Sequence, residues 1–151
     1  MSENKRKALS AVLICLCIAT VAFIWGNSML GSKASSNVSN SVLGALDPII
    51  RRFGIVSKDD LWLRKLAHFT EFAALGAELL FLAAVRRRLG LQAASNCAFA
   101  ALLVALTDET IQLASGRNSQ VLDVLLDFSG ALTGILIAWL ICRLIKKRRA
   151  L

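Results

Sequence analysis

Four long apolar stretches dominate this chain and restrict what it can fold into. They cover residues 8–25, 66–85, 91–113 and 124–142, and 56% of all residues are hydrophobic, more than in an ordinary soluble domain. A helix of about 20 apolar residues crosses the hydrocarbon core of a bilayer. The sequence therefore predicts an all-α integral membrane protein, a single domain over residues 1–151 built as an antiparallel bundle of four transmembrane helices.

Basic residues gather at the ends of these stretches and predict the topology. Residues 5–7, 86–88 and 143–149 contain eleven of the 18 Lys and Arg residues, and all three groups lie on one side if every stretch crosses the membrane. Positive residues beside membrane helices mark the cytoplasmic side. We therefore expect a multi-pass protein of the cell membrane with both termini, including the basic tail 143–151, in the cytoplasm. The net charge of +8 follows the bilayer, so no nucleic-acid partner is expected.

The longest polar interval, residues 26–63, is expected to be an extracellular loop. Apolar residues recur at helical spacing over residues 38–53, which favours an amphipathic helix lying on the outer leaflet. Pro48 would kink a helix of that length, so an irregular loop is the alternative.

Ionisable residues inside apolar stretches need an explanation, because a charge in hydrocarbon is costly. Such residues stand near the ends of three stretches: His68 and Glu71, then Asp108, Glu109 and Gln112, then Asp123 and Asp127. At about 100° per residue each group can face the bundle centre, and the predicted topology gives the three groups a similar depth near the outer surface. We therefore predict one outward-facing polar site. Glu78 lies two turns deeper, and its role is left open.

Two interpretations of these residues remain open. In the first, Arg64, Lys65 and Arg117 neutralise the acids and the whole set simply holds the helices together. In the second, the five acids outnumber the bases because a cation, a proton or a polar headgroup completes a site. Asp108 and Glu109 stand near the C-terminal end of a helix, which disfavours negative charge, so we expect them to carry a proton or to pair with Arg117.

The spacing of these residues resembles the VanZ-like family over roughly residues 62–136. The matching blocks are Lys65-x-x-His68-x-x-Glu71, Asp108-Glu109-x-x-Gln112, Gly116-Arg117 and Asp123-x-x-x-Asp127. The resemblance implies a small bacterial membrane protein related to one that gives resistance to the lipoglycopeptide antibiotic teicoplanin. It implies no particular reaction.

From the residues and the resemblance together we predict a protein that binds or modulates a lipid headgroup, a lipid-linked cell-wall precursor or a lipoglycopeptide. The predicted ligand-binding residues are Arg64, Lys65, His68, Glu71, Asp108, Glu109, Gln112, Arg117, Asp123 and Asp127.

One alternative is a membrane enzyme in which His68 acts as acid or base on an envelope lipid, with Glu71, Asp108, Glu109 and Asp127 as the other catalytic candidates. Another is a small proton-coupled transporter with Glu78 as a deep relay. His68 and Glu71 also resemble half of a carboxylate-bridged metal pair, for which a hard cation such as Mg²⁺ would suit the oxygen-rich set. Because the chain has a single histidine, we predict no metal site, and no cofactor is expected.

Overall fold

The protein is described by a computed structural model that covers residues 2–29, 60–116 and 120–148. Nearly all of these residues lie in four helices: α1 (Glu3–Met29), α3 (Asp60–Val85), α4 (Leu91–Ala114) and α5 (Val121–Arg148). Each helix contains one of the four apolar stretches, and each is long and apolar enough to cross a membrane. The prediction of an all-α membrane protein with four spanning helices is therefore confirmed.

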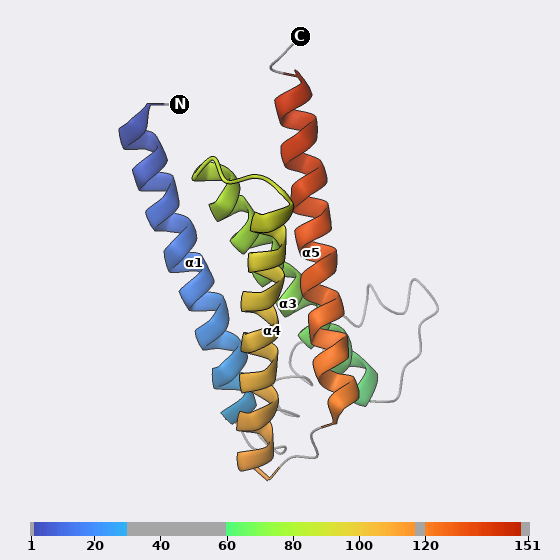
Figure 1. Ribbon diagram of the computed structural model, residues 1–151. Helices are drawn as coiled ribbons and strands as arrows, with labels where there is room; N and C mark the ends of the chain where they lie inside the picture. Colours follow the sequence, from blue (N-terminus) through green and yellow to red (C-terminus); the bar gives the residue numbers. More distant parts are fainter. Residues whose placement is uncertain (1, 30–59, 117–119, 149–151) are drawn as a thin grey trace, which may run out of the picture.

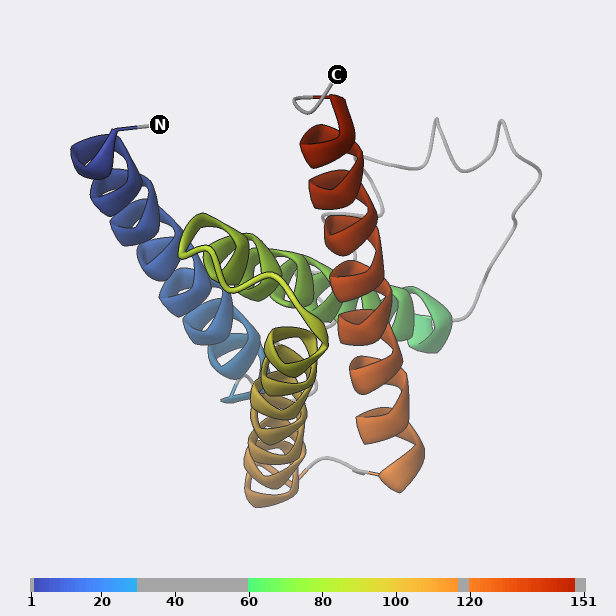
Figure 2. The same cartoon turned by 45° about the horizontal axis from the view of Figure 1, so that its top comes forward.

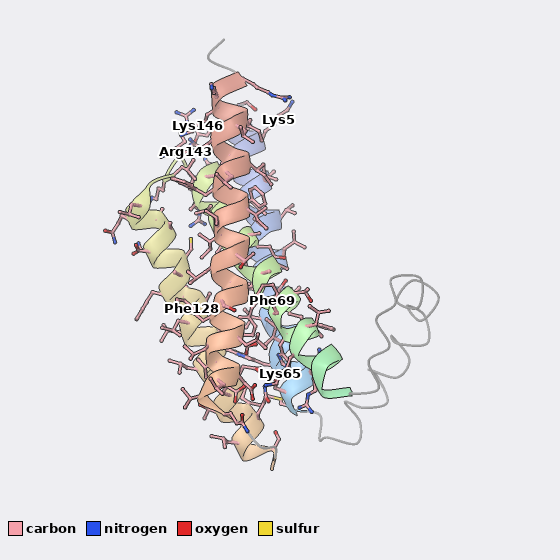
Figure 3. All side chains as sticks on the ribbon, turned by 90° about the vertical axis from the view of Figure 1, so that its right-hand side faces the viewer. Lys5, Lys65, Phe69, Phe128, Arg143 and Lys146 are labelled. Atoms are coloured by element: carbon pink, nitrogen blue, oxygen red, sulfur yellow. The ribbon has the colours of Figure 1, made fainter. Side chains whose placement is uncertain are left out.

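The two chain ends and the turn between α3 and α4 lie at the same end of the bundle, so consecutive helices run in opposite directions (Figure 1). Lys5, Arg143 and Lys146 lie at this end, whereas Lys65 lies toward the other end (Figure 3). We call the first of these the basic end and the second, where the acidic residues described below lie, the acidic end. The guanidinium of Arg143 stacks on the Trp139 ring, 3.9 Å from its centroid. Which side of the membrane the basic end faces stays a prediction.

The interval between the first two helices is shorter than the sequence indicated. α1 continues to Met29 and α3 begins at Asp60, each several residues beyond its apolar stretch. The predicted amphipathic helix over residues 38–53 lies outside the described residues, and so does Arg117.

Glycines bring α3 and α5 into close backbone contact. Figure 2 shows α3 running obliquely across α5, which is its most extensively contacting neighbour. A Cβ added to Gly134 of α5 would lie 2.7 Å from the carbonyl carbon of Ala73, and one added to Gly130 would lie 3.1 Å from that of Phe69. The same crossing brings Gly76 of α3 against the backbone of Ala131. Small residues at these positions let two membrane helices approach without side chains between them.

Two small apolar cores hold the helices together on either side of the middle of the bundle. The core toward the acidic end contains Ile24, Phe72, Leu75, Ala101, Ala105 and Ala131. The core toward the basic end contains Leu80, Cys97, Ile135 and Ala138. Large apolar side chains such as Phe99, Leu103 and Leu136 instead point outward. Outward apolar side chains on every long helix are what a bilayer requires, because lipid rather than water surrounds them.

Candidate functional site

Polar side chains from all four helices converge at the acidic end. The set consists of Ser28 from α1, His68 and Glu71 from α3, Asp108 and Gln112 from α4, and Asp127 from α5. We call this set the polar cluster. Asp108 and Asp127 are 0% and 1% exposed, so neither carboxyl group reaches solvent in the folded chain. The predicted convergence of polar residues from the last three helices is therefore observed, with a contribution from the first helix as well.

Asp108 has the most complete hydrogen bonding of the cluster. The Ser28 hydroxyl donates to Asp108 Oδ1 at 2.6 Å, and the Gln112 amide donates to Asp108 Oδ2 at 2.7 Å. Gln112 also contacts the Ser28 hydroxyl, 3.4 Å away. Hydrogen bonds to a charged oxygen are stronger than neutral ones. Among the described residues the partners of Asp108 are thus two neutral donors, Ser28 and Gln112. The expected alternatives, a proton on Asp108 or a pair with Arg117, stay predictions, because Arg117 lies outside these residues.

The centre of the cluster, around His68, is incompletely paired. His68 Nδ1 lies 4.0 Å from Glu71 Oε2 and 4.0 Å from Asp108 Oδ2, and both separations are too long for a hydrogen bond. Within the described part of the chain, His68 Nδ1, Glu71 Oε2 and Asp127 Oδ2 are buried and have no hydrogen-bond partner. Buried polar atoms are normally paired, so those that are not mark a place where another group is expected.

An ion pair lies beside this cluster. Lys65 Nζ is 2.9 Å from Asp123 Oδ1, so α3 and α5 are also joined by charge near their N-terminal ends. Glu109 is 5% exposed on α4, and Arg64 is half-buried one residue before Lys65. The predicted pairing of an α4 acid with Arg117 stays a prediction. Pairing with a base thus accounts for the charge of Asp123, but it does not account for the unpaired buried atoms at the centre of the polar cluster.

Sequence reasoning missed the contribution of α1. Ser28 is 0% exposed against Asp108, and Thr20, two turns earlier, donates a hydrogen bond to Glu78 Oε1 at 3.0 Å. Thr20, Ile24 and Ser28 are four residues apart, so one face of α1 carries both hydroxyls. That spacing is visible in the sequence, but a serine at the end of an apolar run carries no charge, so it indicates part of the serine-rich outer segment and not a member of the site.

An apolar groove of about 330 Å³ lies one helical turn from the polar cluster. Side chains of α1, α3 and α4 line it, among them Trp25, Leu75 and Val104. Trp25 Nε1 donates to the Val104 carbonyl at 3.5 Å. One turn further toward the acidic end, the same three helices present Ser28, Glu71 and Asp108. Of these three residues, Glu71 is half-buried, whereas Ser28 and Asp108 are fully buried behind it.

Four long apolar helices around a buried polar cluster define a small multi-pass membrane protein. The family model VanZ/LLP1 matches residues 9–143, which is most of the chain, and the protein therefore belongs to the VanZ-like family. The resemblance noted from the motif blocks is confirmed. No curated protein and no solved structure matches the chain significantly.

Proposed function

We propose that this VanZ-type membrane protein binds the polar headgroup of an envelope lipid or of a lipid-linked wall precursor at its polar cluster. Binding there would change how a lipoglycopeptide such as teicoplanin acts at the cell surface. The single observation that carries the proposal is the incomplete pairing of buried polar atoms around His68 and Asp127. A cluster that served only to join helices would be expected to satisfy its own members.

The shape of the surroundings favours a lipid over a small soluble ligand. The apolar groove lies one helical turn from the cluster and is bounded by the helices that supply Ser28, Glu71 and Asp108. An acyl or isoprenoid chain in this groove would bring its headgroup to the level of the cluster. Moving a methylene group from water into an apolar groove contributes about 0.8 kcal/mol, but a lipid chain that already lies in the bilayer does not gain this energy. The headgroup contacts must therefore supply the selectivity.

The acids determine which headgroups suit the cluster. Glu71, Asp108 and Asp127 are acceptors when ionised, so they favour a headgroup rich in hydroxyl or amine donors. Lys65, which is 39% exposed beside Asp123, would contact a phosphate at the rim. A sugar phosphate or an amino-alcohol phosphate has both features.

The test compares lipids that copurify with the wild-type protein and with Asp127→Asn. Asp127 Oδ2 has no partner among the described residues, so this substitution removes an acceptor charge without breaking a described hydrogen bond. The control is Thr107→Val, because Thr107 is exposed on α4 next to Asp108 and its hydroxyl donates to the Leu103 carbonyl and not to a member of the polar cluster, as far as the described residues go. Lipids are extracted from protein in mild detergent and compared with bulk membrane lipid by mass spectrometry.

We expect one lipid class to be enriched with the wild type and with Thr107→Val and to be depleted with Asp127→Asn. Teicoplanin susceptibility should follow the same order in cells with equal membrane abundance of the three proteins. Equal lipid profiles for all three would contradict the proposal. Direct binding of teicoplanin by lipid-free protein would instead identify the antibiotic as the ligand.

A membrane enzyme is the second candidate, and the position of His68 favours it. Its Nδ1 lies 4.0 Å from carboxylate oxygens of both Glu71 and Asp108, so one imidazole has two acids to orient it. A histidine in such a position suits acid or base catalysis. The two candidates separate in the same mass spectra, because an enzyme leaves a modified lipid and a binding protein leaves the lipid unchanged.

A further inference from the structure

We propose that His68, Asp108 and Asp127, with Glu71 beside them, form a binding site for a divalent transition-metal ion such as Mn²⁺ or Zn²⁺. This site shares His68 and Asp127 with the proposed headgroup site, but its test counts bound metal rather than lipid, so either proposal can fail without the other. In the sequence, His68 and Glu71 resemble only half of a metal site, and the single histidine led us to predict none. The fold supplies the two aspartates from α4 and α5.

The separations of the side-chain atoms carry the first step. One ligand atom each from His68, Asp108 and Asp127 lies within 4.8 Å of the other two. Bonds from a metal ion to nitrogen or oxygen are about 2.0–2.2 Å, so neighbouring ligands of a tetrahedral ion are about 3.4 Å apart. The longest separation would have to shorten by up to about 1.4 Å, which small movements of two side chains toward one ion can supply.

Charge carries the second step. Glu71, Asp108 and Asp127 are three acids beside one imidazole, and no ion pair with a lysine or arginine reaches them within residues 2–29, 60–116 and 120–148. The neighbouring base, Lys65, is paired with Asp123 instead. Buried carboxyl groups without a counter-charge take up a proton, and a divalent ion that displaces such protons would supply the missing counter-charge instead.

Burial carries the third step, because two of the ligand atoms have nothing else to bind. Asp127 is 1% exposed, and its Oδ2 atom lacks a hydrogen-bond partner within the described segments, as does the buried His68 Nδ1. Asp108, in contrast, is held by Ser28 and Gln112. Each carboxylate oxygen has a further lone pair, so Asp108 can keep both partners and still bind a metal. Partners of this kind fix the orientation of metal ligands.

The ligand types select the class of ion. Imidazole nitrogen suits Zn²⁺ and other transition metals, and carboxylate oxygen suits Mn²⁺ as well. Mg²⁺ and Ca²⁺ prefer sites made of oxygen alone. The imidazole placed against two aspartates therefore points to a transition metal rather than to the hard cation that would suit the acids by themselves.

The test uses the full-length protein, purified in detergent with an affinity tag that contains no histidine. The protein is stripped with a chelator and loaded with Mn²⁺ or Zn²⁺, and the bound metal is counted per chain by elemental mass spectrometry. Variants His68→Gln and Asp127→Asn remove ligands. The matched control is Glu78→Gln, which also replaces an acid on α3, two turns from Glu71. Glu78 Oε1 accepts a hydrogen bond from Thr20 and Oε2 has no partner among the described residues, but Glu78 does not belong to the group of ligand atoms within 4.8 Å of one another.

We expect the wild type and Glu78→Gln to retain one ion per chain, and the two ligand variants to bind at least about tenfold more weakly. Pulsed electron paramagnetic resonance of the Mn²⁺-loaded wild type should detect a coordinated imidazole nitrogen. His68 is the one histidine of the chain, so that signal identifies the ligand even where a variant fails to fold. Loss of all metal from the wild type, or bound Mn²⁺ without a nitrogen coupling, would overturn the proposal.

Discussion

The substitution Gly134→Ala tests whether the contact between α3 and α5 positions the polar cluster. The added Cβ would lie 2.7 Å from the Ala73 carbonyl carbon and 3.0 Å from its Cα, whereas ordinary contacts begin at 3.4 Å. Because these are backbone atoms, no side-chain rotation can relieve the overlap. The Ala73 carbonyl oxygen lies nearer still, so the two helices must separate by more than about 0.7 Å at this point, the difference between 3.4 and 2.7 Å for the carbonyl carbon.

Such a separation has a calculable effect on stability. Overpacking of a close contact typically costs about 1–3 kcal/mol, and the higher helix propensity of alanine offsets up to about 1 kcal/mol of it. We therefore expect a net loss of about 1–2 kcal/mol. Asp127 lies two turns from Gly134 on the same stripe of α5, so the shift should also move this aspartate relative to His68 and weaken any ligand that both contact.

Unfolding in detergent micelles, followed by circular dichroism during heating or denaturant titration, measures the loss. The matched control is Gly26→Ala on α1, where an added Cβ would meet nothing within 4 Å. That variant should be as stable as the wild type or up to about 1 kcal/mol more stable, because alanine has the higher helix propensity and its methyl group meets no other atom. Equal stability of Gly134→Ala and the wild type, or an equal loss in Gly26→Ala, would refute the reasoning.

Three further predictions follow from the site and the topology. Ser28→Ala removes the 2.6 Å hydrogen bond to a fully buried carboxylate and should cost about 1–3 kcal/mol in the same unfolding assay, while Ser129→Ala, at an exposed serine, should be nearly neutral. Lys65→Met should cost less than about 1 kcal/mol, because this ion pair is 39% and 24% exposed; a larger loss would show that Lys65 is part of the structural framework. Alkaline phosphatase fused after Leu151 should be inactive and a fusion after Gly116 active; the opposite result would reverse the assigned topology.

Much of the fold could be predicted because a bilayer leaves few choices. Every backbone polar group in hydrocarbon must be paired within the chain, so four apolar stretches of sufficient length have to form four helices. The extent of each helix was less predictable, since α5 continues through the basic residues to Arg148 and α1 continues to Met29. Polar residues at helix ends can be solvated at the membrane surface, so hydropathy gives no signal for where such a helix stops.

The candidate site was predicted in part. Helical periodicity correctly placed Asp108 and Gln112 on one face, where they are joined by a 2.7 Å hydrogen bond. It gave no information about which residue of another helix would meet them. The contact of Ser28 with Asp108 was therefore not predicted, and neither was the pair of neutral donors, a hydroxyl and an amide, from which Asp108 accepts hydrogen bonds.

The sequence by itself determined the membrane class, the number of spanning helices and the family. Each of these follows from local composition or from spacing along one chain segment. Only the tertiary structure decided that His68, Asp108 and Asp127 lie within 4.8 Å of one another and that hydroxyl groups of α1 complete the polar contacts. The physical reason is that helix-to-helix distance and rotation depend on packing, here on backbone contact at Gly130 and Gly134, and residues far apart in sequence carry no local record of that contact.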